Sequence, residues 1–182
     1  MIIFGLLIAL ITGVLFIILC TNIIISLFRK KPFPKKMLIA TSIGFFLLLT
    51  IYIYEVYFFT FNHIDRDNLQ EGPGPVASPT EEYTANAYYE PYGGAAGGVN
   101  VLVEITDHRD HQSQIIYYGD AKTDFNLDWV GENTLYIHND HPENSNSNRS
   151  ITLQVDKEIY HESGFVCKSL LMKDRYETCY QN

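Results

Sequence analysis

The stretch "SPTEEYTANAYYEPYGGAAGGVNVLVEI" (residues 78–105) decides the fold class. Apolar or small side chains recur at every second position, first from Tyr83 to Tyr89 and again from Val99 to Ile105. This period is typical of β-strands with one buried face. The "GGAAGG" between the two runs lacks Gly-x-Gly-x-x-Gly spacing, is followed by no Lys-Ser/Thr pair and leads into a strand instead of a helix. It therefore predicts a connection between two strands and not a phosphate-binding loop.

Similar short segments continue toward the C-terminus. Gly131-Glu132-Asn133 separates two of them and is a good hairpin turn. The tail from Gly164 to Tyr180 is compatible with a short helix or with another hairpin. We expect six to eight short strands in residues 81–182, and so a mainly antiparallel all-β domain, a small sheet or a sandwich-like fold. The further expected strands are 113–119, 124–130, 134–139 and 150–156.

The N-terminal third of the chain has a different character. Residues 2–28 and 37–54 are two uncharged apolar runs, each of a length that can span a bilayer. Between them, "RKKPFPKK" (29–36) carries five positive charges, and its two prolines prevent one continuous helix. Residues 1–61 therefore predict a transmembrane two-helix hairpin, with spans at about 2–28 and 37–58.

The positive charges also predict the orientation of this hairpin. Basic loops stay in the cytoplasm, so the loop 29–36 would be cytoplasmic, and both termini and the β domain would be extracytoplasmic. We interpret the aromatic run Tyr52–Phe61, with its single acid Glu55, as an interfacial belt. Bulky Leu19 before Cys20 argues against a lipoprotein signal. We expect a multi-pass protein of the cell membrane, with the lipid bilayer as its first partner.

Residues 62–80 contain "EGPGPVASP", an alternation of glycine and proline. This composition predicts an extended linker between the membrane part and the β domain.

The charge is distributed unevenly. The whole chain carries −8, but residues 62–182 contain eight Lys/Arg against twenty Asp/Glu and carry −12. An acidic domain without a basic stripe is a poor ligand for phosphate backbones, so the sequence predicts no nucleic-acid partner.

Several of these segments together resemble a known family. "SPTEEYTANAYY", "GGA", "VLVEI", "IIYYG" and the tryptophan before "NTLYI" resemble an uncharacterised domain family of small bacillus-type membrane proteins, over roughly residues 78–140. The resemblance implies a short β domain that follows one or two N-terminal spans, and it implies no activity. The chain departs from the family at Thr80-Glu81-Glu82, where a tight Asp-Gly turn is usual.

Two histidine pairs are the candidate metal ligands. His108 and His111, and likewise His138 and His141, have His-x-x-His spacing with carboxylates nearby. Imidazole with carboxylate suits Zn²⁺ or Cu²⁺. The alternative is that all four are ordinary polar loop residues. In a simple meander the two pairs would lie at opposite ends of the sheet, which disfavours one four-histidine site.

Cys167 and Cys179 are the candidate disulfide. Both lie in the expected extracytoplasmic domain, an oxidising compartment. If the tail is a hairpin centred on Lys173, the two cysteines are directly opposite each other. The sequence contains no Cys-x-x-Cys motif, which is the pattern that would indicate a redox role.

No hydrolytic motif appears in a recognisable context, so we assign no catalytic residue and no cofactor. The leading hypothesis is a non-enzymatic, membrane-anchored extracytoplasmic β module that binds, senses or assists another membrane or cell-surface protein. A metal-binding protein or metal-dependent enzyme that uses the histidine loops is the second hypothesis, and a structural subunit of a membrane complex is the third.

Overall fold

The structure is a computed structural model that describes residues 2–30 and 32–182. The chain divides into two compact units, Met1–Phe58 and Phe59–Asn182. Each unit is described by itself.

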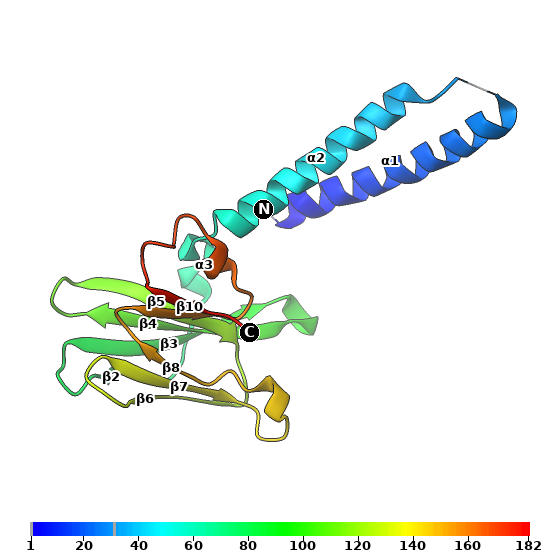
Figure 1. Ribbon diagram of the computed structural model, residues 1–182. Helices are drawn as coiled ribbons and strands as arrows, with labels where there is room; N and C mark the ends of the chain where they lie inside the picture. The colour runs from blue at the N-terminus through cyan, green and yellow to red at the C-terminus, as the bar shows by residue number, and fades with distance from the viewer. Residues whose placement is uncertain (1, 31) are drawn as a thin grey trace. The chain divides into compact units, whose positions relative to one another are not determined.

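The first unit contains two long apolar helices, α1 (Ile2–Arg29) and α2 (Lys35–Tyr57), which run antiparallel (Figure 1). Proline lacks an N–H and fits the start of a helix, so Pro34 immediately before α2 is consistent with a helix that begins at Lys35. The two helices approach closely at Gly44, where a Cβ atom would overlap the Thr12 side chain. Phe16 and Phe45 meet edge to face nearby, with 5.9 Å between ring centroids.

Most side chains of these helices are exposed. Among those whose burial the structure describes, the buried residues of α1 and α2 are Thr12, Leu19, Thr41 and Val56. Leucine, isoleucine and phenylalanine side chains remain exposed on both helices. By length and composition, both helices are long and apolar enough to cross a membrane.

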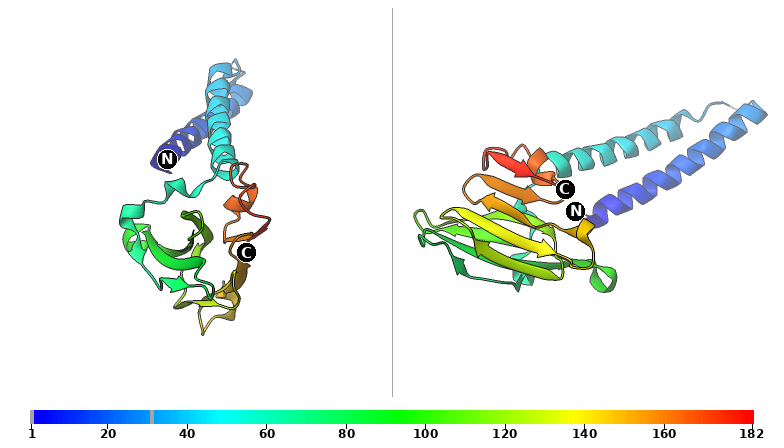
Figure 2. Two further views of the ribbon diagram at one scale, coloured as in Figure 1. Left: turned by 90° about the vertical axis from the view of Figure 1, so that its left-hand side faces the viewer. Right: turned by 60° about the horizontal axis from the view of Figure 1, so that its bottom comes forward.

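The second unit is a mostly antiparallel β domain with two sheets (Figures 1 and 2). The first sheet has seven strands in the order β1-β3-β4-β5-β9-β10, with β2 also paired to β3. The second sheet has the order β6-β7-β8. The strands are β1 (Gln70–Glu71), β2 (Val76–Ala77), β3 (Tyr83–Tyr92), β4 (Gly98–Asp107), β5 (Gln112–Asp120), β6 (Asp124–Trp129), β7 (Thr134–Asp140), β8 (Ile151–Gln154), β9 (Glu158–His161) and β10 (Thr178–Tyr180). The short helices are η1 (Phe61–His63), η2 (Arg66–Asn68), η3 (Gly94–Ala96), η4 (Ser145–Ser147) and α3 (Phe165–Lys168).

The hairpin β3–β4 forms from the stretch with two-residue alternation. The strands pair from Tyr83 opposite Asp107 to Tyr92 opposite Gly98, so the glycine-rich segment is the connection between strands that the sequence predicts. Gly93 has φ +74°, a conformation that favours glycine, and a Cβ atom there would lie 2.8 Å from the Gly97 Cα. The turn therefore requires glycine for its backbone shape.

Alternation along β4 builds the core. Val101, Val103 and Ile105 are fully or almost fully buried in one cluster with residues of the second sheet. Leu102 points to the other face of the first sheet, where it packs with Ile64 and Ile115. The first sheet is thus covered on both faces, by the second sheet and by the segment that enters the domain.

The segment 62–80 differs from the extended linker that its composition predicts. It contains η1, η2, β1 and β2, and both strands pair antiparallel with β3. Pro73 lies between them, yet its carbonyl still accepts a hydrogen bond from Ala87 N at 2.9 Å. Proline cannot donate to a ladder but is compatible with an edge strand, so this glycine and proline composition suits an interrupted sheet edge.

The C-terminal region also differs from the simplest expectation. The tail forms α3 and β10, and β10 pairs parallel with β9, so the tail is not a hairpin centred on Lys173. β9 in turn pairs parallel with β5. The otherwise antiparallel first sheet therefore carries two parallel contacts on one side.

Candidate functional site

A groove opens where β5 and β9 diverge. These parallel strands pair only at Tyr117–Tyr160 and Tyr118–His161, and before these pairs they separate. The gap forms a groove of about 570 Å³, a size typical of small-ligand sites. We name it the fork groove. It is lined by residues 60–62, 64, 66, 113–116, 155–159, 171, 172, 175 and 176.

Both walls of the fork groove are strand edges. One wall is Ser113–Ile116 of β5, which pairs with β4 on its other side. The opposite wall includes Glu158 and Ile159 of β9, which pair with β10 on their other side. Every second residue of such an edge directs its backbone N–H and C=O away from its one neighbouring strand. The groove is thus bordered by backbone donors and acceptors from both sides.

One hydrogen bond joins the two walls. Gln114 Nε2 donates to the Val155 carbonyl at 2.8 Å. Gln114 is opposite Ile105, so it lies on the face of the first sheet that packs on the second sheet. Both residues of this bond line the groove, and Ile115 lies on the other face of the sheet.

Three cations border the fork groove in a domain that is otherwise acidic. Arg66 donates two hydrogen bonds of 3.1 Å to the buried carboxylate of Glu104, and these bonds raise the pKa of the guanidinium. Lys157 lies 3.9 Å from a Glu177 oxygen, a distance at the limit of an ion pair. Arg175 has no ion pair within residues 2–30 and 32–182.

The carboxylates that border the groove are already engaged. Glu158 accepts hydrogen bonds from Gln154 N and Tyr180 Oη, both at 2.8 Å. Asp156 accepts one from Asn133 Nδ2 at 3.3 Å. Asp156 and Glu158 keep their negative charges, because these hydrogen-bond donors are neutral, and Arg175 is a groove cation that makes no ion pair within the described part of the chain.

His161 lies where β5 and β9 pair, at the closed end of the fork groove, and is almost fully buried. Its ring stacks on Tyr118 at 5.2 Å between centroids and meets Phe59 edge to face at 5.0 Å. Neither ring nitrogen has a hydrogen-bond partner among the described residues. Burial lowers the pKa of His161 to about 4, so the imidazole is neutral at ordinary pH.

The two histidine pairs lie far apart. His108 and His111 lie in the turn between β4 and β5, just before the first residue of β5, whereas Asn139, between His138 and His141, donates a hydrogen bond to the carbonyl of Asp120 at the end of β5. The nine residues of β5 separate the pairs by roughly 25 Å. Within the described part of the chain, no three His, Cys, Asp or Glu side chains form a group that could hold a metal.

The histidines of these pairs also have neighbours of their own. The His108 Nε2 lies 2.7 Å from Thr84 Oγ1, and the His138 Nδ1 lies 3.3 Å from Tyr136 Oη. The structure therefore offers an ordinary hydrogen-bonding role for one histidine of each pair.

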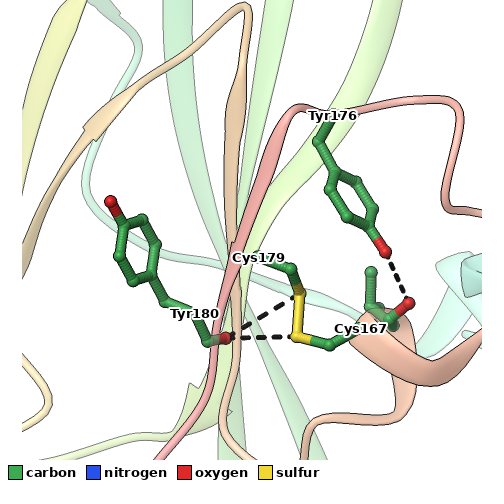
Figure 3. The surroundings of a disulfide bond; sticks show 5 residues. Cys167, Tyr176, Cys179 and Tyr180 are labelled. Atoms are coloured by element: carbon green, nitrogen blue, oxygen red, sulfur yellow. Dashed lines mark hydrogen bonds between the residues drawn. A yellow bond between two sulfur atoms is a disulfide. The ribbon is translucent and has the colours of Figure 1, made fainter.

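Cys167 and Cys179 form a disulfide, with 5.4 Å between their Cα atoms (Figure 3). Cys167 is in α3 and Cys179 is in β10, so the two meet because α3 packs beside the last strand. Tyr176 Oη donates to the Val166 carbonyl at 2.6 Å in the same closed loop. The bond thus fixes the tail to the sheet by a geometry other than the cross-strand pair of a hairpin.

Sequence patterns predicted neither the fork groove nor the buried His161. The groove depends on where two parallel strands separate, and strand periodicity carries no information about the partner of a strand. Only the Ile-Tyr-His run at the end of β9, apolar around a histidine, indicates a buried imidazole.

The fold and the groove define a class of protein: a two-sheet β domain that follows two apolar helices. A match to the Family of unknown function (DUF5412) covers residues 33–161, and the chain belongs to this family. The match includes α2 and all strands through β9, and it ends before α3, the disulfide and β10. No curated protein and no solved structure matches the chain.

Proposed function

We propose that the chain is a membrane-anchored protein whose β domain lies outside the cytoplasm. In this arrangement α1 and α2 form a transmembrane hairpin, the basic loop between them is cytoplasmic, and both termini are extracytoplasmic. The apolar, mostly exposed surfaces of both helices support this proposal, because exposing so much apolar surface to water is unfavourable. The disulfide supports an oxidising location for the β domain.

Cysteine labelling of intact cells tests this orientation. The paired Cys167 and Cys179 do not react with maleimide, and Cys20 lies within α1. We expect a membrane-impermeant maleimide to label Asn126→Cys in β6 on intact cells and to label Lys36→Cys only after lysis. The reverse pattern would overturn the orientation.

We further propose that the fork groove binds an extended peptide segment of another membrane or cell-surface protein. The observation that carries this proposal is that two strand edges face one groove, Ser113–Ile116 on one side and the start of β9 on the other. A peptide in extended conformation hydrogen-bonds to such edges through its own backbone, whatever its side chains. The groove would therefore select peptides first by their extended backbone conformation.

The charge of the groove would select among extended peptides by their side chains. Arg175 is exposed at the groove and makes no ion pair within residues 2–30 and 32–182, whereas Asp156 and Glu158 already accept hydrogen bonds from other groups of the domain. An acidic side chain of the peptide would pair with Arg175, since the acidic remainder of the domain repels it elsewhere. We therefore expect extended peptides that contain Asp or Glu.

Selection from a random peptide library on the full-length protein in detergent tests this function. We expect enriched peptides to slow hydrogen exchange in residues 112–116 and 158–159, and to lose affinity when alternate residues are N-methylated. Arg175→Glu should weaken binding at least tenfold, whereas Lys173→Glu, an exposed neighbour that does not line the groove, should leave it unchanged. Enriched peptides that protect other strands would contradict the proposal.

The metal hypothesis remains a prediction with its own test. Zn²⁺ or Cu²⁺ would have to bind at one pair, His108 with His111 or His138 with His141, because the two pairs lie at opposite ends of β5. Titration of the full-length protein with each ion, followed by thermal unfolding, measures this binding. A rise in Tm that His108→Ala or His138→Ala removes would establish the site.

A further inference from the structure

The positive charges of the β domain gather in one region. Of its eight Lys/Arg residues, Lys168, Lys173 and Arg175 lie in the segment 165–175, which contains a single acid, Asp174. Four other cations make ion pairs of 2.6–3.1 Å with nearby carboxylates. The three in the segment have no ion pair within the described part of the chain. We name residues 165–175 the tail loop.

Exposed apolar side chains lie in the same loop. Phe165, Leu170 and Leu171 expose 37%, 53% and 55% of their surface. Val166, Ser169 and Met172 are buried and direct their side chains into the domain. The packing of this loop depends on its buried residues, so its outward positions could all be polar. Three exposed apolar side chains in seven residues therefore indicate a surface that covers them.

The tail loop is bonded to Phe59, the first residue of the β domain. Ser169 Oγ donates a hydrogen bond to the Phe59 carbonyl at 2.7 Å, and the ring centroids of Phe59 and Phe165 are 5.9 Å apart. Only Phe58 separates Phe59 from Tyr57, the last residue of α2. By chain length and this hydrogen bond alone, Leu170 lies at most about 20 Å from the end of α2.

The loop is also held in one shape. The disulfide joins Cys167 to Cys179, and Tyr176 Oη bonds to the Val166 carbonyl (Figure 3). Ser169 Oγ, besides donating to Phe59, accepts a hydrogen bond from Leu171 N at 3.2 Å. Exposed leucines on a fixed loop lose little conformational entropy when they are buried.

We propose that the tail loop docks on the membrane that α2 leaves, with Phe165, Leu170 and Leu171 in the interfacial layer and Lys168 and Lys173 against anionic lipid headgroups. This proposal rests on the membrane anchoring proposed above. Apolar side chains flanked by cations are the composition that binds an anionic bilayer surface. The cost of bringing the loop to the surface is small, because the anchor already holds it within reach.

Tryptophan quenching in vesicles tests this docking. The full-length protein, in which Trp129 is the single native tryptophan, is reconstituted into vesicles of phosphatidylcholine and phosphatidylglycerol, with and without brominated acyl chains. We expect the additional emission of Leu170→Trp to fall by at least half in brominated vesicles. Lys168→Glu/Lys173→Glu should remove most of this quenching.

Val130→Trp is the matched control. Val130 is 61% exposed and directly follows β6 of the second sheet, which packs on the opposite face of the first sheet from Ile64 and the entering segment. Its emission should be unchanged by bromination, and quenching equal to that of Leu170→Trp would overturn the proposal. So would unquenched Leu170→Trp in protein that vesicles retain after alkaline extraction. Loss of the protein on extraction would instead contradict the anchor.

Discussion

The rings of Tyr118 and His161 stack across the parallel strands β5 and β9, 5.2 Å apart between centroids, at the last pair of residues that joins these strands. His161 is thereby placed between the sheet and Phe59, the first residue of the β domain. The contact requires a neutral imidazole, because neither ring nitrogen has a hydrogen-bond partner in residues 2–30 and 32–182 that would stabilise a positive charge.

We predict that the β domain loses stability as the pH falls from about 6.5 to about 4. Burial lowers the pKa of His161 from 6.5 to about 4 in the folded protein, so the unfolded chain binds the proton first. The stability is fully present above about pH 6.5 and decreases by about 3 kcal/mol on reaching pH 4. Urea unfolding at a series of pH values measures this decrease.

His161→Phe is the control for this titration. Phenylalanine retains the aromatic contacts with Tyr118 and Phe59 and cannot take up a proton. The variant should lose about half or more of the decrease between these pH values. An unchanged pH dependence would show that other groups cause it.

We predict that removal of the disulfide lowers the free energy of unfolding by about 3 kcal/mol, the chain-entropy value for a loop closed over 12 residues. The double variant Cys167→Ser/Cys179→Ser should match the wild-type protein in reducing agent. Cys20→Ser, which changes the free cysteine, should unfold like the wild-type protein. Thermal unfolding with and without reductant distinguishes these cases, and equal Tm values for all would refute the prediction.

Arg66→Ala should destabilise the β domain by about 2 kcal/mol, because the carboxylate of Glu104 would remain buried without its cation. Adding Glu104→Gln should restore part of this loss, since the neutral amide costs less to bury. Lys157→Ala is the comparison: its partner Glu177 lies 3.9 Å away and both side chains are exposed, so we expect almost no change. Chemical denaturation of the three variants gives the values.

Asn139→Ala should cost about 3 kcal/mol. The Asn139 side chain is fully buried and links the two sheets: it donates to Tyr117 Oη and to the Asp120 carbonyl, and it accepts from Lys122 N. The alanine variant removes this partner from the Asp120 carbonyl and from Lys122 N, whereas Tyr117 Oη keeps its hydrogen bond to the Arg149 carbonyl. Asn126→Ala removes an exposed asparagine from the adjacent strand and should change stability by less than about 0.5 kcal/mol.

Where side chains alternate, the sequence predicted the strands well. The alternating runs from Tyr83 to Tyr89 and from Val99 to Ile105 lie in β3 and β4, and the turn at Gly131-Glu132-Asn133 joins β6 to β7. One buried face forces a period of two, which is visible without any knowledge of the partner strand. The two apolar helices were evident for a similar reason, since uncharged runs of this length are rare.

The features that pairing alone creates could not be predicted. β1 and β2 have two residues each, too few to show a period, and Gly72, Pro73 and Pro75 around them suggest a linker. The partners of β9 depend on contacts with residues some 20 and 40 positions away along the chain. The candidate groove depends on which strands pair with β9, so local sequence patterns could not predict it.

The place of β9 beside β5 also determines the order in which the domain can be completed. The three strands of the second sheet lie between β5 and β9 along the chain, so a growing polypeptide has β5 in place well before its neighbour is synthesised. During that interval the whole outer side of β5 is a bare edge, open to pairing with other nascent chains. Completion of this sheet must therefore await the synthesis of β9 and β10, and chains that stop before residue 158 should aggregate.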